Sequence, residues 1–252
     1  MFSAFMDVDS VRKIIKLNSL SMANGREPYT MVFESRERRL AFKEAFSEVL
    51  KSSPEWSGQS AAKVEKAIFP YVTDRLDRMS AQDVLYIQGH GLPGGRGVSS
   101  KKGEFRGMGV IADALIKMML PGNVKVKLIS CWSGAEAEIV IPAASAKKYH
   151  DAFNYIEANQ GRFSHTSAGM LDAALRQRQV DRSRGSVFGY LGQITSFPQE
   201  QEVVERTSEG KFRRSSGHAV AAFPIEGSVG QGDLFMDFRR SLFRRSNPCP
   251  GV

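Results

Sequence analysis

The middle of the chain shows two short apolar segments separated by a helical pattern. Segments 84–91 and 124–134 are typical of strands, and residues 107–120 between them repeat apolar side chains at helical spacing. This pattern predicts a strand, a loop, a helix and a second strand. A crossover through a helix makes the two strands parallel, so their C-terminal ends share the sheet edge that carries active sites in open α/β proteins. His90 and Cys131 stand at these two ends.

Similar patterns on both sides of this unit predict an α/β protein with a mostly parallel sheet. A short β-prone run at 29–33 precedes a helical pattern, and Pro70 should divide a later one. Residues 92–106, which are rich in Gly, Ser and Lys, are expected to form a loop. Further helices are predicted at residues 38–51, 61–77, 146–156 and 170–175.

Both ends of the chain are expected to lie outside the α/β core. Residues 1–28 carry a short helical pattern followed by a polar stretch and are interpreted as an N-terminal arm, so the domain should span 29–230. Within it, β-prone segments replace helical ones over 186–225, with a hairpin turn at 208–210. Residues 231–252 are interpreted as a basic, flexible tail.

Length and composition narrow the class of protein. At 252 residues and 42% hydrophobic, the chain can bury one substantial core. It has no apolar run of about 18 residues, so no membrane span is expected. The start lacks the charged flank and apolar stretch of a secretory signal, so export would need a route without one. With two cysteines, of which Cys249 lies in the tail, a disulfide framework is not expected and a reducing compartment fits.

A histidine and a cysteine at neighbouring strand ends have the arrangement that a thiol nucleophile and its base require. Neighbouring strands lie about 4.8 Å apart, so the imidazole of His90 and the sulfur of Cys131 can face each other. The amides of Gly91 and Cys131 can stabilise the oxyanion of an attacked carbonyl, and a glycine allows close approach. The alternative is a structural cysteine, because free cysteine is among the most buried residue types.

Two other kinds of site fit the sequence less well. Residues 89–94 have the dinucleotide pattern G-x-G-x-x-G after a strand, but Pro93 and a glycine-rich stretch follow where a helix should open to hold the pyrophosphate. The histidines are scattered and no His or Cys pair has ligand spacing, so no metal site is expected. His150, His165 and His218 are interpreted as solvated surface residues.

With His-Gly after one strand and Ser-Cys after the next, the chain resembles the caspase-like (clan CD) cysteine peptidases. It is most similar to the inositol-hexakisphosphate-activated, self-processing cysteine protease domain of large bacterial toxins. The resemblance covers residues 29–225. It implies a caspase-like three-layer sandwich with a mostly parallel central sheet flanked by helices, followed by a β-flap near 186–225. It also implies chemistry without a cofactor, and inositol hexakisphosphate as an activator.

The resemblance assigns roles to further residues. In the family an acidic residue just after the first strand orients the histidine, and that position falls on Glu37, with Glu34 as a substitute. An acidic-Gly-basic turn in the flap carries phosphate ligands, which residues 209–214 resemble, whereas Ser130 replaces the usual glycine before the cysteine. A solvated basic face is the alternative to a polyphosphate site in a chain of net charge +8. The candidate polyphosphate-binding residues are Lys51, Lys211, Arg213 and Arg214.

Two hypotheses of different classes follow. The first is a cysteine endopeptidase with a Cys131/His90 dyad. The resemblance implies a bacterial effector or toxin-type protease, secreted without a classical signal peptide, that acts on a host protein in the host cytoplasm. The toxin domains that the chain resembles prefer leucine before the scissile bond, which makes Leu20-Ser21 a candidate self-processing site. The second is a non-catalytic basic module for nucleic acid or an anionic membrane, although no recognised motif favours a nucleic-acid partner.

Overall fold

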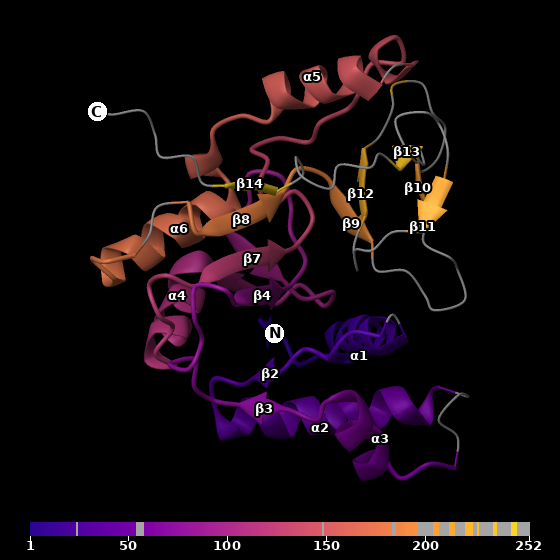
Figure 1. Ribbon diagram of the computed structural model, residues 1–252, viewed down its shortest axis with the longest axis vertical. Coiled ribbons are helices and arrows are strands. Elements are labelled where there is room, and N and C mark those ends of the chain that lie inside the picture. Colours follow the sequence, from indigo (N-terminus) through magenta and orange to yellow (C-terminus); the bar gives the residue numbers. More distant parts are fainter. Residues whose placement is uncertain are drawn as a thin grey trace.

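The centre of the molecule is a seven-stranded sheet (Figure 1). Its strands are β1 (Phe2–Ser3), β2 (Met31–Val32), β3 (Val72–Thr73), β4 (Val84–Gln88), β7 (Lys125–Ile129), β8 (Val187–Tyr190) and β14 (Phe243–Arg245). Their spatial order is β14-β8-β7-β4-β1-β2-β3, and all neighbours are parallel except β14, which pairs antiparallel with β8. The prediction of an α/β protein with a mostly parallel sheet is therefore confirmed.

The structure is a computed structural model. It describes residues 1–23, 25–53, 58–147, 149–182, 185–195 and 226, together with the short strands 204–206, 212–214, 220–223, 234–235 and 243–245.

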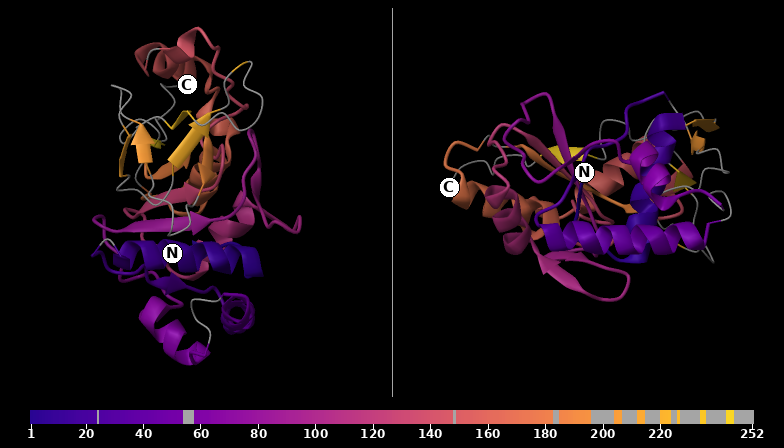
Figure 2. Two further views of the ribbon diagram at one scale, coloured as in Figure 1. Left: turned by 90° about the vertical axis from the view of Figure 1, so that its right-hand side faces the viewer. Right: turned by 90° about the horizontal axis from the view of Figure 1, so that it is seen from below.

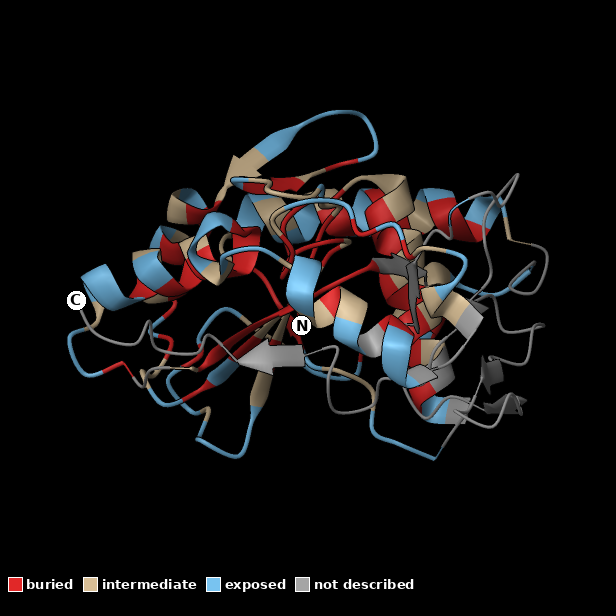
Figure 3. Cartoon of the chain, turned by 90° about the horizontal axis from the view of Figure 1, so that it is seen from above, coloured by how far each residue is buried: buried red, intermediate tan, exposed pale blue. Residues whose placement is uncertain are grey.

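Helices cover both faces of the sheet and so make three layers, as Figure 1 shows. Strand alternation separates the two cores: Phe2 and Val32 face one layer of helices, whereas Met1 and Met31 face the other. The first face carries α4 (Met108–Lys117) and α6 (Ser167–Arg178), and the second carries α1 (Val8–Ala23), α2 (Arg36–Lys51) and α3 (Ala61–Ile68). In Figure 3 the buried residues accordingly gather along the strands and on the inner sides of the helices.

The predicted strand–helix–strand unit is present. β4 and β7 are adjacent and parallel over registers from Val84↔Lys125 to Gln88↔Ile129, with α4 as the crossover between them. Its apolar face is buried through Ile111 and Leu115, both 0% exposed. Pro70 divides the predicted helix over 61–77, because α3 ends at Ile68 and β3 follows.

The N-terminal residues differ from the arm that the sequence suggested. β1 lies inside the sheet, where Phe2 is paired with Ile87 of β4 and Val32 of β2. α1 follows at once and buries Val11 and Ile14, each 0% exposed. β1 and α1 therefore belong to the core of the domain. A strand of two residues is too short to show alternation, which is why the hydrophobic pattern did not reveal it.

The expected loop at 92–106 also contains structure. β5 (Gly97–Ser99) and β6 (Phe105–Gly107) form an antiparallel hairpin. The hairpin projects from the body of the molecule in the right-hand view of Figure 2, and its tip is exposed in Figure 3. Its first strand is joined to the segment after β4 by backbone hydrogen bonds in both directions between His90 and Ser99, at 2.9 and 2.8 Å.

The strands of the region predicted to be β-rich belong partly to the central sheet and partly to smaller sheets. β8 belongs to the central sheet, parallel to β7. Beyond it, smaller antiparallel sheets are formed by β9 (Gln193–Thr195), β12 (Val220–Phe223) and β13 (Leu234–Phe235), and by β10 (Val204–Arg206) and β11 (Phe212–Arg214). The expected turn at 208–210 lies outside the described residues. The expected tail, 231–252, contributes β13 and β14.

Candidate active site

The two predicted chemical groups come from equivalent places on neighbouring strands. The last register pair of β4 and β7 is Gln88↔Ile129, so His90 and Cys131 each follow two residues beyond it. Parallel strands place both residues at the C-terminal edge of the sheet, as the sequence predicted. Cys131 is half-buried and packs against a small apolar cluster that includes Trp132.

Gly91 shows how closely the two strand ends approach. A Cβ atom built on Gly91 would lie 2.0 Å from the Ser130 hydroxyl oxygen and 2.3 Å from the Cys131 carbonyl oxygen. Any side chain at this position would overlap the backbone of the cysteine loop. A glycine after His90 is therefore what lets this segment pack directly against Ser130 and Cys131.

The loop after Cys131 is held by hydrogen bonds to the end of β8. The Ser133 hydroxyl donates to the Leu128 carbonyl at 3.0 Å and accepts from the Tyr190 amide at 2.9 Å. The Gly134 amide donates to the Tyr190 carbonyl at 2.7 Å. Trp132 has a left-handed backbone conformation, with φ 54°, which is uncommon for a residue other than glycine. These bonds hold a sharp turn directly after the thiol.

The buried side chain of Trp132 also fixes the loop. This side chain is 4% exposed and packs in a small apolar cluster with Ile139, Ile141 and Ile156. Ile156 belongs to α5 (Tyr149–Asn159), which caps this end of the molecule in Figure 1. The position of Cys131 is therefore fixed on both sides, by β7 before it and by a buried tryptophan after it.

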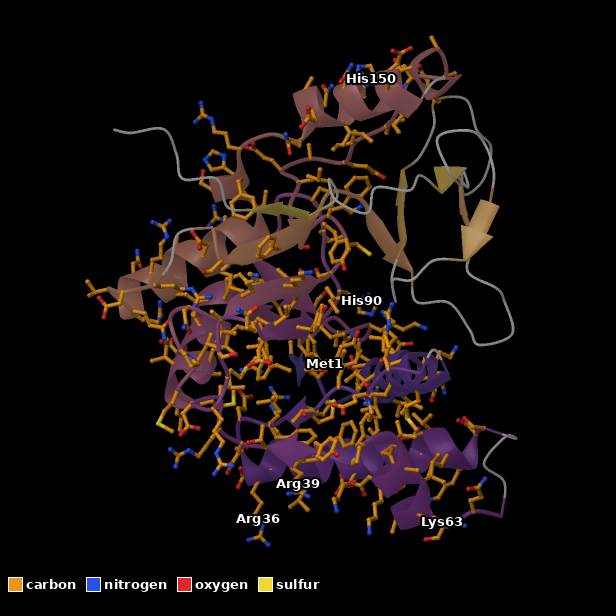
Figure 4. All side chains as sticks on the ribbon, viewed as in Figure 1. Met1, Arg36, Arg39, Lys63, His90 and His150 are labelled. Carbon is orange, nitrogen blue, oxygen red and sulfur yellow. The ribbon has the colours of Figure 1, made fainter. Side chains whose placement is uncertain are left out.

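The imidazole of His90 faces the first turns of α1 (Figure 4). Its Nε2 atom lies 2.8 Å from Lys13 Nζ and 3.4 Å from Asp9 Oδ2. Asp9 also pairs with Lys13 at 3.2 Å and with Lys101, from the β5–β6 hairpin, at 3.8 Å. The side chains of His90 and Asp9 are 34% and 24% exposed, so the group is partly shielded from water.

The charges around Asp9 keep it ionised. Partial burial alone would raise the pKa of this carboxyl group, but Lys13, His90 and Lys101 together outweigh burial and hold the pKa below its ordinary value. A carboxylate is thus available beside the histidine ring.

This acid is not the one that the sequence suggested. Glu37 lies in the first turn of α2, where it is exposed, and its hydrogen bond with Ser35 is the main cause of a lowered pKa. In Figure 4 Arg36, the residue before Glu37, lies far from His90. Glu34, the substitute, binds Arg106 at 2.9 Å and Arg38 at 2.9 Å. The structure thus places Asp9, and not Glu37 or Glu34, beside the imidazole of His90.

Asp9 is not evident from the sequence, because the hydrophobic pattern makes 29–33 the first strand and the resemblance places the acid after it. One signal was present. Asp7 caps α1 by accepting from the amides of Asp9 and Ser10, both at 3.1 Å, and an acidic residue before a helical pattern is typical of such a start. A helix beginning near residue 8 leaves only a few apolar residues before it, which could have been read as a strand.

The polyphosphate candidates are only partly described. Lys51 is exposed and ends α2. Arg213 and Arg214 lie on β11, and their side chains, like the whole of Lys211, are outside the described residues. The grouping of these four residues stays a prediction.

The other histidines within the described residues lie away from this edge or have partners of their own. His150 is exposed on α5, at the far end of the molecule from His90 in Figure 4. His165 Nδ1 lies 2.7 Å from Glu136 Oε1. In the described part of the chain, no group of three or more His, Cys, Asp or Glu side chains could hold a metal ion. In that part, no helix is long and apolar enough to span a membrane.

No protein-family model, curated protein or solved structure matches the chain. The case for a function therefore rests on the geometry of the site.

Proposed function

We propose that the protein is a cysteine endopeptidase in which Cys131 is the nucleophile and His90 the general base. The observation that carries the proposal is the pairing of β4 and β7, because His90 and Cys131 each lie two residues beyond its last pair. The tight packing of Gly91 on the Ser130 side chain and the Cys131 carbonyl supports it, because it brings the two segments into contact. A thiol and an imidazole at one sheet edge are the two groups that nucleophilic catalysis needs.

The chemistry follows from these positions. His90 takes the proton of the Cys131 thiol, and the thiolate attacks the scissile carbonyl. The amides of Gly91 and Cys131 are the proposed donors that stabilise the developing oxyanion. His90 then gives its proton to the leaving amine, and water releases the acyl group from the sulfur.

Asp9 completes the constellation as the acid beside the imidazole. When His90 is protonated during the reaction, Asp9 carries the opposite charge 3.4 Å from Nε2. A carboxylate at this place orients the ring and stabilises the imidazolium ion. This is the role that the sequence assigned to Glu37.

The family and biological setting belong to the same proposal. The chain order of strand-His and strand-Cys and the mostly parallel sheet with helices on both faces support a caspase-like peptidase. The proposed setting is a bacterial effector that acts on a host protein in the host cytoplasm, with inositol hexakisphosphate as an activator. Self-processing at Leu20-Ser21 would need local unfolding, because Ser21 lies in α1 and is 2% exposed.

Labelling with peptidyl electrophiles tests the proposal. A panel that varies the side chain before the electrophile should modify the wild-type protein at Cys131, with and without inositol hexakisphosphate. Cys131→Ala should lose both labelling and peptide cleavage, and Cys249→Ala, which removes the other cysteine, is the matched control and should keep both. Cleavage by Cys131→Ala at the wild-type rate would rule out the thiol mechanism. Nucleic-acid binding without any reaction at Cys131 would favour the binding-module alternative.

A further inference from the structure

Two side chains of α1 compete for one atom of His90. Asp9 and Lys13 are one helical turn apart and form an ion pair at 3.2 Å. Both point at Nε2, with Lys13 at 2.8 Å and Asp9 at 3.4 Å. The three side chains are between 24% and 34% exposed, so these contacts are made partly out of water.

The shorter contact limits what the imidazole can do. A neutral imidazole has one N–H donor and one lone pair, whereas an ammonium group has donors only. A hydrogen bond from Lys13 to Nε2 therefore uses the only lone pair of His90 and places the ring proton on Nδ1. In that tautomer neither ring nitrogen can accept a proton, whichever of the two faces the thiol.

Asp9 allows the opposite arrangement. A carboxylate is an acceptor only, so a hydrogen bond to Asp9 requires the proton on Nε2 and leaves the lone pair on Nδ1 free. Lys13 does not need to travel far to permit this change, because it already contacts the same Asp9 oxygen. The proton leaves Nδ1 and another arrives at Nε2 by exchange with water, with no net change in charge.

We propose that Lys13 is a positioning residue that holds His90 in its non-basic tautomer in the resting protein, and that transfer of Lys13 to Asp9 makes His90 a base. In the basic arrangement, a proton moves from Cys131 Sγ to Nδ1, and the resulting imidazolium donates from Nε2 to Asp9. The consequence for reactivity rests on the proposed function, whereas the tautomer itself does not.

Nitrogen NMR of the full chain labelled with 15N-histidine tests the tautomer directly. The spectrum of His90→Asn identifies the signals of His90 among the four histidines. The wild type should show Nε2 as an unprotonated nitrogen and Nδ1 as a protonated one. In Lys13→Met the ring proton should be on Nε2, and Nδ1 should be the unprotonated nitrogen. Lys13→Arg, which keeps a cationic donor, should resemble the wild type. Lys16→Met makes the same substitution in the same helix and should leave the signals unchanged.

The reactivity of Cys131 gives a second readout. Alkylation by iodoacetamide should be about tenfold faster in Lys13→Met than in the wild type, because one charge-assisted hydrogen bond no longer occupies the lone pair. Lys16→Met should react at the wild-type rate. Melting curves of the variants exclude unfolding as the cause of a faster reaction.

The two proposals fail in different ways. An unchanged His90 tautomer in Lys13→Met would overturn this inference, whether or not the protein cuts peptides. A changed tautomer together with a Cys131 that no peptidyl electrophile modifies would uphold the hydrogen-bond assignment and overturn the proposed peptidase function.

Discussion

Replacing Gly91 with alanine should destabilise the fold and disturb the candidate active site together. The new Cβ would lie 2.3 Å from the Cys131 carbonyl oxygen, whereas ordinary contacts begin at 3.4 Å, so this backbone must move by roughly 1 Å. The Ser130 hydroxyl, at 2.0 Å, would have to rotate within a buried site. Forcing extra volume into a packed core costs about 1–3 kcal/mol, and we expect about 2–3 kcal/mol because a main-chain atom is displaced.

Urea unfolding followed by far-ultraviolet circular dichroism measures this cost. With a slope of about 2–3 kcal/mol per molar, the midpoint of Gly91→Ala should fall by about 1 M. Labelling of Cys131 by a peptidyl electrophile should slow in the same variant under native conditions. Gly109→Ala is the matched control, because Gly109 lies in α4 and, outside the backbone of that helix, a new Cβ would approach only the Arg178 side chain, at 3.8 Å. Alanine in a helix is favoured over glycine by about 0.5–1 kcal/mol, so the control should be at least as stable as the wild type.

A Gly91→Ala protein with a wild-type midpoint and wild-type labelling would refute the reasoning. It would mean that the segment after His90 is not packed against the cysteine loop. The proposed peptidase would then lose the contact that brings its two reacting groups together.

Three further predictions concern single side chains. Ser130→Ala should change stability little or raise it by up to about 1 kcal/mol in urea unfolding, because the buried hydroxyl has no hydrogen-bond partner in the structure; a clear loss of stability would contradict this. Thr166→Ala should lower the unfolding free energy by about 1–2 kcal/mol, since the Thr166 hydroxyl caps α6 by accepting from Gly169 at 3.1 Å; an unchanged melting temperature would show that the cap is dispensable. Burial opposes ionisation of Glu34, but Arg106 and Arg38 outweigh it and lower its pKa, so its contribution to stability is present above its ordinary pKa and lost as pH falls through the lowered value. The stability difference between wild type and Glu34→Gln should therefore shrink as the pH falls below the ordinary glutamate pKa of about 4.3, and a constant difference would argue against the ion pairs.

The sequence was most informative where the hydrophobic pattern was long. The strands that end near His90 and Cys131 are five residues each, and the helix between them shows three turns of periodicity, so their parallel pairing could be predicted. β1 could not, because two buried residues carry no alternation, and its place in the sheet is decided by partners far along the chain. Propensity in such a short segment is overridden by tertiary contacts.

The residues of the candidate site were also predictable only in part. His90, Gly91 and Cys131 were identified because each stands directly after a recognisable strand. Asp9 was not, because its distance from His90 depends on where α1 lies on the sheet rather than on local sequence. Lys13 was hidden for the same reason, since a lysine in an amphipathic helix is ordinarily a solvated residue.

The insertion of β1 between β4 and β2 has a consequence for the order of assembly. The hydrogen bond from the Ser3 hydroxyl to the Gln88 side chain joins groups 85 positions apart, so β1 can dock only when β4 is in place. Until β1 docks, β4 and β2 are not joined in the sheet, and α1 is not held beside His90. A partly unfolded chain would then carry Cys131 without a properly held His90, so the proposed catalytic pair would be complete only in the fully folded domain.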